Sequence, residues 1–180
     1  ILRCLVGSEM CIRDSVFFES DYPSEFNTIF EERNVPSKPT VYLCAQDRGP
    51  KGSLNGSERL LMLVNAPADG DRQNWSDDDV TRTRDSALAV LERCGLNLSF
   101  RDSDCVSTTP KDWHGRFPGS GGSLYGGASH GIWSSFTRPG ARSRLKGLYL
   151  SGGSVHPGPG VPMATLSGRL AASAVIRDIA

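Results

Sequence analysis

The stretch GLYLSGGSVHPGPGVPMATLSGRLAASAV, residues 147–175, decides the fold of this chain. An apolar strand predicted at 148–151 runs into paired glycines, where absent side chains let a ligand approach the backbone. Pro162 suits the first turn of a helix, and the free N–H groups at such a helix start favour an anionic or electron-rich ligand. The buried stripe of this helix is predicted to comprise Met163, Leu166, Leu170 and Ala174. The pattern predicts a strand–loop–helix cradle for a cofactor; a generic Gly/Pro turn explains the composition equally well.

Composition limits the remaining function classes. The 180 residues carry 20 basic and 20 acidic side chains, so we expect no nucleic-acid partner. Apolar runs are far shorter than the ~20 residues of a membrane span. Five cysteines, an odd number without CxxC spacing, fit free thiols in a reducing, cytoplasmic compartment. The three histidines lack metal-ligand spacing, and we expect no metal site.

The N-terminal part of the chain predicts a small α+β arrangement. Residues 1–15 have no signal-peptide architecture and are interpreted as a non-native leader, the alternative being an ordinary strand at 4–6 followed by a turn. A short strand is expected at 16–18 and an amphipathic helix at 23–33. The apolar runs 40–45 and 58–66 flank a Gly/Pro/Asn-rich loop, which predicts a β-hairpin with a long tip.

Ser76 begins the clearest helix pattern. It is a good N-cap, and the three aspartates that follow favour the positive end of the helix dipole, an explanation preferred over a metal site. Gly95 is expected to stop this helix. Further strands are expected at 96–101 and 105–108, and loops with a short helix over 110–140.

Several strings of the chain resemble the FAD-dependent carotenoid desaturases, which are related to phytoene desaturase within the FAD-containing amine oxidoreductase superfamily. The strings are GLYLSGGSVHPGPGVPMATLSGRLAA (147–172), TTPKDWHGRFPGSGGSLYGGASHG (108–131), FTRPGARS (136–143) and VFFESDYPSEFNTIFEERNVPSKPTVYLCAQDR (16–48). The resemblance covers 16–179 almost continuously. The form GGSVHPGPGVPM is most similar to the hydroxycarotenoid 3,4-desaturase (methoxyneurosporene dehydrogenase) branch.

The resemblance implies a mixed α/β fold, the C-terminal part of a two-domain Rossmann-like flavoprotein with a β-sheet substrate domain. Residues 16–140 are then expected to belong to the substrate-binding domain, and 141–180 to complete the FAD-binding domain. The dinucleotide motif GxGxxG is missing, because the nearest glycines, Gly119, Gly121 and Gly122, neither follow a strand nor complete it. The chain is therefore expected to be a fragment, inactive alone.

The resemblance also implies roles for individual residues. Gly152, Gly153 and Ser154 match the loop near the ribityl and pyrophosphate groups of FAD. The start of the following helix matches the backbone that faces the flavin ring, at Val161, Pro162, Met163 and Ala164. His156 is a candidate for the catalytic base, with a hydrogen-bonded loop histidine as the alternative. The aromatic residues that are candidates for lining a polyene channel, with core packing as the alternative, are Tyr125, Trp133 and Phe136.

The implied reaction moves a hydride from an allylic carbon to FAD and a proton from the neighbouring carbon, adding a double bond to a hydrophobic carotenoid. The expected activity is 1-hydroxycarotenoid 3,4-desaturation. The alternatives are a phytoene desaturase or carotenoid isomerase of the same superfamily, and a non-catalytic domain that binds apolar ligands or partners. Peripheral membrane association is also expected, because carotenoids are insoluble in water.

Overall fold

The computed structural model describes residues 14–47, 56–124 and 138–179. It combines helices with a small antiparallel sheet, in agreement with the predicted mixed fold. The chain divides into two compact units, residues 1–112 and 113–180, which are described separately below. The predicted domain boundary between 140 and 141 stays a prediction.

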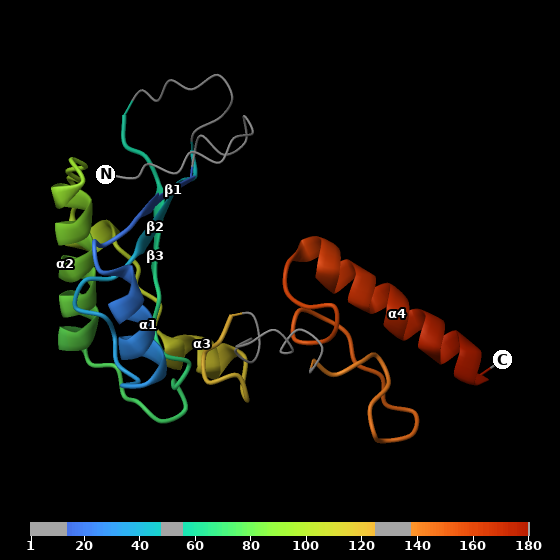
Figure 1. Cartoon of the computed structure of the whole chain (residues 1–180). Coiled ribbons are helices and arrows are strands. Elements are labelled where there is room, and N and C mark those ends of the chain that lie inside the picture. The colour runs from blue at the N-terminus through green and yellow to red at the C-terminus, as the bar shows by residue number, and fades with distance from the viewer. Residues whose placement is uncertain (1–13, 48–55, 125–137, 180) are drawn as a thin grey trace. The chain divides into compact units, whose positions relative to one another are not determined.

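The first unit is built on a three-stranded sheet of order β1-β2-β3 (Figure 1). Strands β1 (Asp14–Phe17), β2 (Val41–Ala45) and β3 (Leu60–Val64) are antiparallel. The predicted hairpin is thus confirmed. Strand β1 begins two residues earlier than expected, so Asp14 and Ser15 already pair with β2. The interpretation of residues 1–15 as a leader stays a prediction.

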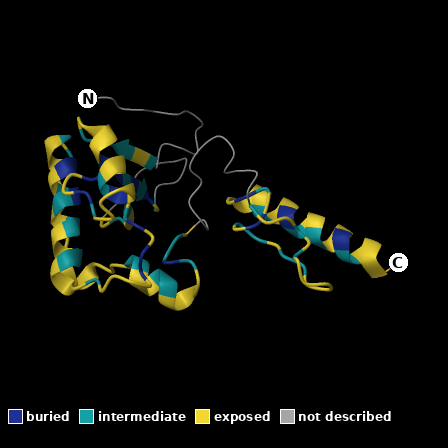
Figure 2. Cartoon of the chain, turned by 60° about the horizontal axis from the view of Figure 1, so that its bottom comes forward, coloured by how far each residue is buried: buried dark blue, intermediate teal, exposed yellow. Residues whose placement is uncertain are grey.

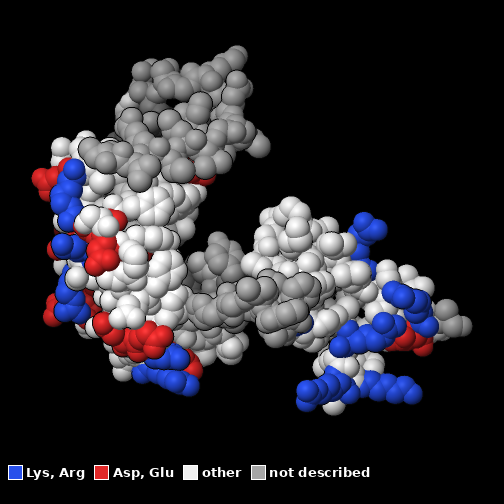
Figure 3. Space-filling view, viewed as in Figure 1, with Lys and Arg blue, Asp and Glu red and all other residues white. Residues whose placement is uncertain are grey.

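Helix α2 (Asp77–Arg93) lies along the sheet and closes the core of this unit (Figure 1). The Ser76 hydroxyl accepts from the Asp79 amide and the Asp79 carboxylate accepts from the Ser76 amide, which confirms the predicted N-cap. Gly95, at φ 84°, ends the helix as expected. The core consists of Val41, Ala87, Val90 and Leu91, each at most 1% exposed. Acidic and basic side chains alternate over the outer surface of the helix (Figure 3).

Helix α1 (Tyr22–Phe30) is fixed to the sheet by a buried carboxylate. Glu25 is 4% exposed and accepts hydrogen bonds from the Thr40 amide at 3.0 Å, from the Thr40 hydroxyl, and from the Asn65 side-chain amide at 3.0 Å. These bonds join the helix to the residues just before β2 and just after β3. The helix ends three residues before the predicted Arg33, whose φ of 51° is incompatible with continued helix.

Two predicted strands are wrong. Residues 96–101 and 105–108 pair with no strand in the described part of the chain, and a short 3₁₀ helix, η2 (Asp102–Asp104), lies between them. Leu96 and Leu98 nevertheless pack against the core of the first unit. Their apolar character therefore reflects packing against this core rather than a ladder of hydrogen bonds.

In the second unit, the main element is α4 (Val161–Ile179), which starts where Pro162 predicted (Figure 2). The predicted strand at 148–151 is reduced to a single antiparallel bridge between Tyr149 and Arg142. Helix α3 (Pro110–Arg116), at the junction of the units, is the short helix expected in 110–140. Among the described residues, no helix is long and apolar enough to cross a membrane.

The predicted buried stripe of α4 is only partly correct. Ala174 is 2% exposed, whereas three large apolar side chains of the stripe are 39–45% exposed. These three are Met163, Leu166 and Leu170, named here the apolar face of α4. Buried in their place is Ser167, at 0% exposed. The difference has a physical cause, since no described element of the second unit packs over the apolar face.

Candidate cofactor site

A glycine-rich loop, residues 152–160, leads directly into α4. Gly152 and Gly160 have φ values of 120° and 99°, a region that disfavours other residues. A Cβ atom built at either position would meet no atom within 4 Å, so the backbone borders open space there. The loop can therefore admit a flat ligand close to its main chain.

The start of α4 adds hydrogen-bond donors to the same place. The first bond of the helical ladder runs from the Ala164 amide to the Gly160 carbonyl, at 2.8 Å. Pro162 has no N–H group, and the amides of Val161 and Met163 precede the ladder and have no acceptor within the helix. Val161 is 82% exposed and Met163 is 45% exposed, so this end of the helix is accessible. Its positive dipole end favours an anionic or electron-rich group.

The loop is held from outside by two side chains. Ser167, from the second turn of α4, accepts a hydrogen bond from the Gly152 amide at 3.2 Å. The Arg138 guanidinium donates to the Gly153 carbonyl at 3.0 Å. The His156 amide adds a backbone bond to the Pro139 carbonyl, at 2.9 Å.

The predicted site residues are brought together to different extents. Gly152 and Gly153 lie in the loop, followed by the exposed Ser154. The four predicted residues of the helix start, 161–164, form the first turn of α4. His156 is also exposed and its ring makes no hydrogen bond to the described residues, so the geometry adds nothing to its candidacy as a base. Tyr125, Trp133 and Phe136 lie outside the described residues.

An exposed charged cluster fixes the far end of α4. Arg142 donates to Asp178 at 2.7 Å and the Tyr149 hydroxyl donates to the other carboxylate oxygen at 2.7 Å. The two donors, Arg142 first, lower the pKa of Asp178 to about 2. Accordingly, the pKa of Tyr149 is raised. The cluster ties the helix to the bridge that precedes the glycine loop.

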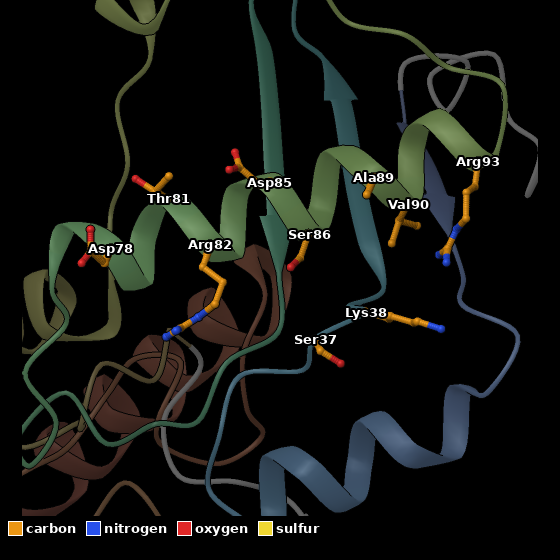
Figure 4. Close-up of a pocket in the computed structure, with 10 residues that line it drawn as sticks. All are labelled: Ser37, Lys38, Asp78, Thr81, Arg82, Asp85, Ser86, Ala89, Val90 and Arg93. Atoms are coloured by element: carbon orange, nitrogen blue, oxygen red, sulfur yellow. The ribbon is translucent and has the colours of Figure 1, made fainter.

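A cavity of about 600 Å³ lies along α2 in the first unit (Figure 4). Lys38 and Arg93 lie at one end of it and Arg82 lies farther along the helix (Figure 4). Arg93 is paired with Glu19 and Arg82 with Asp79. Acidic and basic side chains both line the cavity, and two of its basic groups are paired with carboxylates. Its charge therefore does not indicate which class of ligand it would bind.

Sequence reasoning missed Arg138 and Ser167. Arg138 stood in the string FTRPGARS, which carried the resemblance, but nothing in its spacing pointed to a carbonyl fifteen residues downstream. Ser167 had a weak signal, because a small polar residue interrupts the apolar side of a predicted helix next to Gly168.

Comparison with known proteins places these features in a family. The chain is 50% identical over 169 residues, 93% of its length, to the hydroxyneurosporene desaturase of Rubrivivax gelatinosus, and covers 32% of that protein. It is 42% identical over 164 residues to the enzyme of the same name from Rhodobacter capsulatus, covering 91% of the chain and 32% of the relative. A 1-hydroxycarotenoid 3,4-desaturase from Flavobacterium sp. is 31% identical over 165 residues, covering 89% and 33%.

The chain thus spans about a third of the length of these relatives. The family model of the flavin containing amine oxidoreductases matches residues 15–176, which cover most of both compact units and the whole glycine loop. The chain therefore belongs to the flavin containing amine oxidoreductase family.

Proposed function

We propose that this chain is part of an FAD-dependent carotenoid desaturase and that residues 152–154 and 161–164 contact the FAD. The observation that carries the proposal is the open glycine backbone next to the accessible N-terminus of α4, within a flavin-family match of nearly the whole chain. The relatives named as carotenoid desaturases support the reaction class.

The residues present fit such a cofactor. At Gly152 and Gly160 no side chain separates the main chain from a flat ring or a ribityl chain. The amides of Val161 and Met163 would donate toward the electron-rich part of the group, and the helix dipole would favour negative charge there. Ser154 would offer one further hydroxyl. FAD, when bound, supplies the two-electron oxidation; the chain supplies its placement.

The more specific activity that we propose is 1-hydroxycarotenoid 3,4-desaturation, supported by the names of the hydroxyneurosporene and 1-hydroxycarotenoid relatives.

We further propose that residues 16–140 contribute to the substrate-binding domain and residues 141–180 to the FAD-binding domain. A hydrophobic carotenoid is the proposed partner, delivered at a membrane surface to which the cytoplasmic protein attaches peripherally.

Two measurements on the full-length enzyme test the proposal. The purified protein should show the absorbance bands of bound flavin. Cells supplied in parallel with hydroxyneurosporene, neurosporene or phytoene should convert the hydroxylated carotenoid to a product with one more double bond. Conversion of phytoene alone would indicate a phytoene desaturase, and a change of double-bond geometry without oxidation an isomerase. A protein without flavin and without conversion would favour a non-catalytic binding domain.

A further inference from the structure

A hydrogen bond to a buried hydroxyl group holds the first residue of the glycine loop at 152–160. Ser167 is 0% exposed, and its side-chain oxygen accepts from the Gly152 amide at 3.2 Å. Because Ser167 belongs to α4, the bond ties the beginning of the loop to the helix in which the loop ends. This bond therefore holds the two ends of the loop close together.

Arg138 joins the two halves of the same loop. Its guanidinium donates to the Gly153 carbonyl at 3.0 Å. On the other side, its Nε and Cδ atoms lie 3.6 Å and 3.8 Å from the position that a Cβ atom would occupy on Gly158. One side chain therefore bonds the first half of the loop and lies at van der Waals distance from the second half.

These contacts matter because the loop has little stiffness of its own. Glycine loses more conformational entropy on ordering than any other residue, and Gly152, Gly158 and Gly160 all lie at positive φ. If a ligand had to order the loop, that entropy would be subtracted from its binding free energy. Side chains that hold the loop in the absence of ligand remove this cost.

We propose that Arg138 and Ser167 are positioning residues that pre-organise the 152–160 loop for FAD. The inference rests on the proposed function, because it takes FAD as the ligand of the loop. Neither side chain needs to contact the cofactor: each acts through the backbone of Gly152 or Gly153. Loss of either should weaken FAD binding without altering the reaction that the bound cofactor performs.

The test uses the full-length enzyme, stripped of flavin and titrated with FAD while flavin fluorescence is followed. Ser167→Ala and Arg138→Gln should each raise the Kd of FAD about tenfold, the effect of one lost hydrogen bond. Arg138→Lys keeps a donor but not the planar group that spans to Gly158, and should recover part of the affinity. Ser173→Ala, on an exposed position of α4, and Arg144→Gln, an exposed neighbour, are matched controls.

The outcomes separate the two proposals. If wild-type enzyme takes up no FAD, the proposed function fails. If wild type binds FAD and the Ser167 and Arg138 variants bind it within twofold of the control variants, the positioning role is overturned. It is also overturned if the variants lower the melting temperature of the flavin-free enzyme but leave the FAD Kd unchanged, since the side chains would then be purely structural. The absorbance bands of the bound flavin should be less sharply resolved in the variants than in wild type. The kcat measured at saturating FAD should stay near the wild-type value.

Discussion

Replacing Glu25 by glutamine should destabilise the first unit strongly, although the two side chains have nearly the same shape. Both carboxylate oxygens accept hydrogen bonds: one from the amide and hydroxyl of Thr40, the other from Asn65. Glutamine offers a single oxygen, so its NH₂ group must face a hydrogen-bond donor of either Thr40 or Asn65. At least one hydrogen bond to a charged acceptor is lost in a site that is 4% exposed.

The magnitude follows from the number of bonds. Losing the Asn65 bond alone should reduce the free energy of unfolding by about 2 kcal/mol, the value of a hydrogen bond to a charged group. Glu25→Ala loses all three bonds and leaves buried donors, and should cost about 4 kcal/mol. Thr40→Val removes only the hydroxyl, which also donates to the carboxylate, and should cost about 2 kcal/mol. In the Glu25→Ala background, Thr40→Val should therefore cost much less than it does alone.

Urea unfolding followed by circular dichroism at the helical band measures these differences, because the midpoint shifts with stability. The control is Glu32→Gln, just beyond the same helix and exposed, which should change stability by less than about 0.5 kcal/mol. A Glu25→Gln midpoint equal to that of the control would refute the reasoning. Additive Glu25→Ala and Thr40→Val effects would refute the coupling.

Three further results are expected. Gly70→Ala would place a Cβ 2.2 Å from the Pro110 carbonyl oxygen, and should cost about 3 kcal/mol or more in the same urea assay; Gly140→Ala, which meets nothing within 4 Å, should be nearly neutral. Ser76→Ala removes the capping box of α2 and should cost about 1 kcal/mol, whereas an unchanged midpoint would show that the cap is dispensable. Because the native pKa of Asp178 is lowered to about 2, its contribution to stability is present above about pH 4 and is lost as pH falls toward 2. Asp178→Asn should abolish that acid dependence, which an acid titration followed by circular dichroism would detect; an unchanged acid profile would contradict it.

The sequence predicted best the features that neighbouring residues determine. The N-cap of α2, its glycine stop and the β2–β3 hairpin depend on residues close in the chain, and all three are present. The strands expected at 96–101 and 105–108 failed for the opposite reason. β-Branched and apolar residues favour an extended backbone, but a strand also needs a partner, and the local pattern does not encode one.

The candidate site divides in the same way. The glycine loop and the start of α4 were predictable because Gly, Pro and helical periodicity are local signals. The contact from Arg138 to Gly153 joins residues fifteen apart through an irregular segment, so no period announces it. Burial of Ser167 was not predicted, because helical periodicity assigns the buried face to apolar residues and Ser167 is polar.

The apolar face of α4 has a practical consequence for anyone handling this polypeptide. Met163, Leu166 and Leu170 present a row of large side chains at 39–45% exposure on one long helix. Contiguous apolar surface of this kind promotes self-association in water. A sample of this polypeptide should therefore be sensitive to concentration and ionic strength, and a mild detergent should keep it dispersed by covering that row.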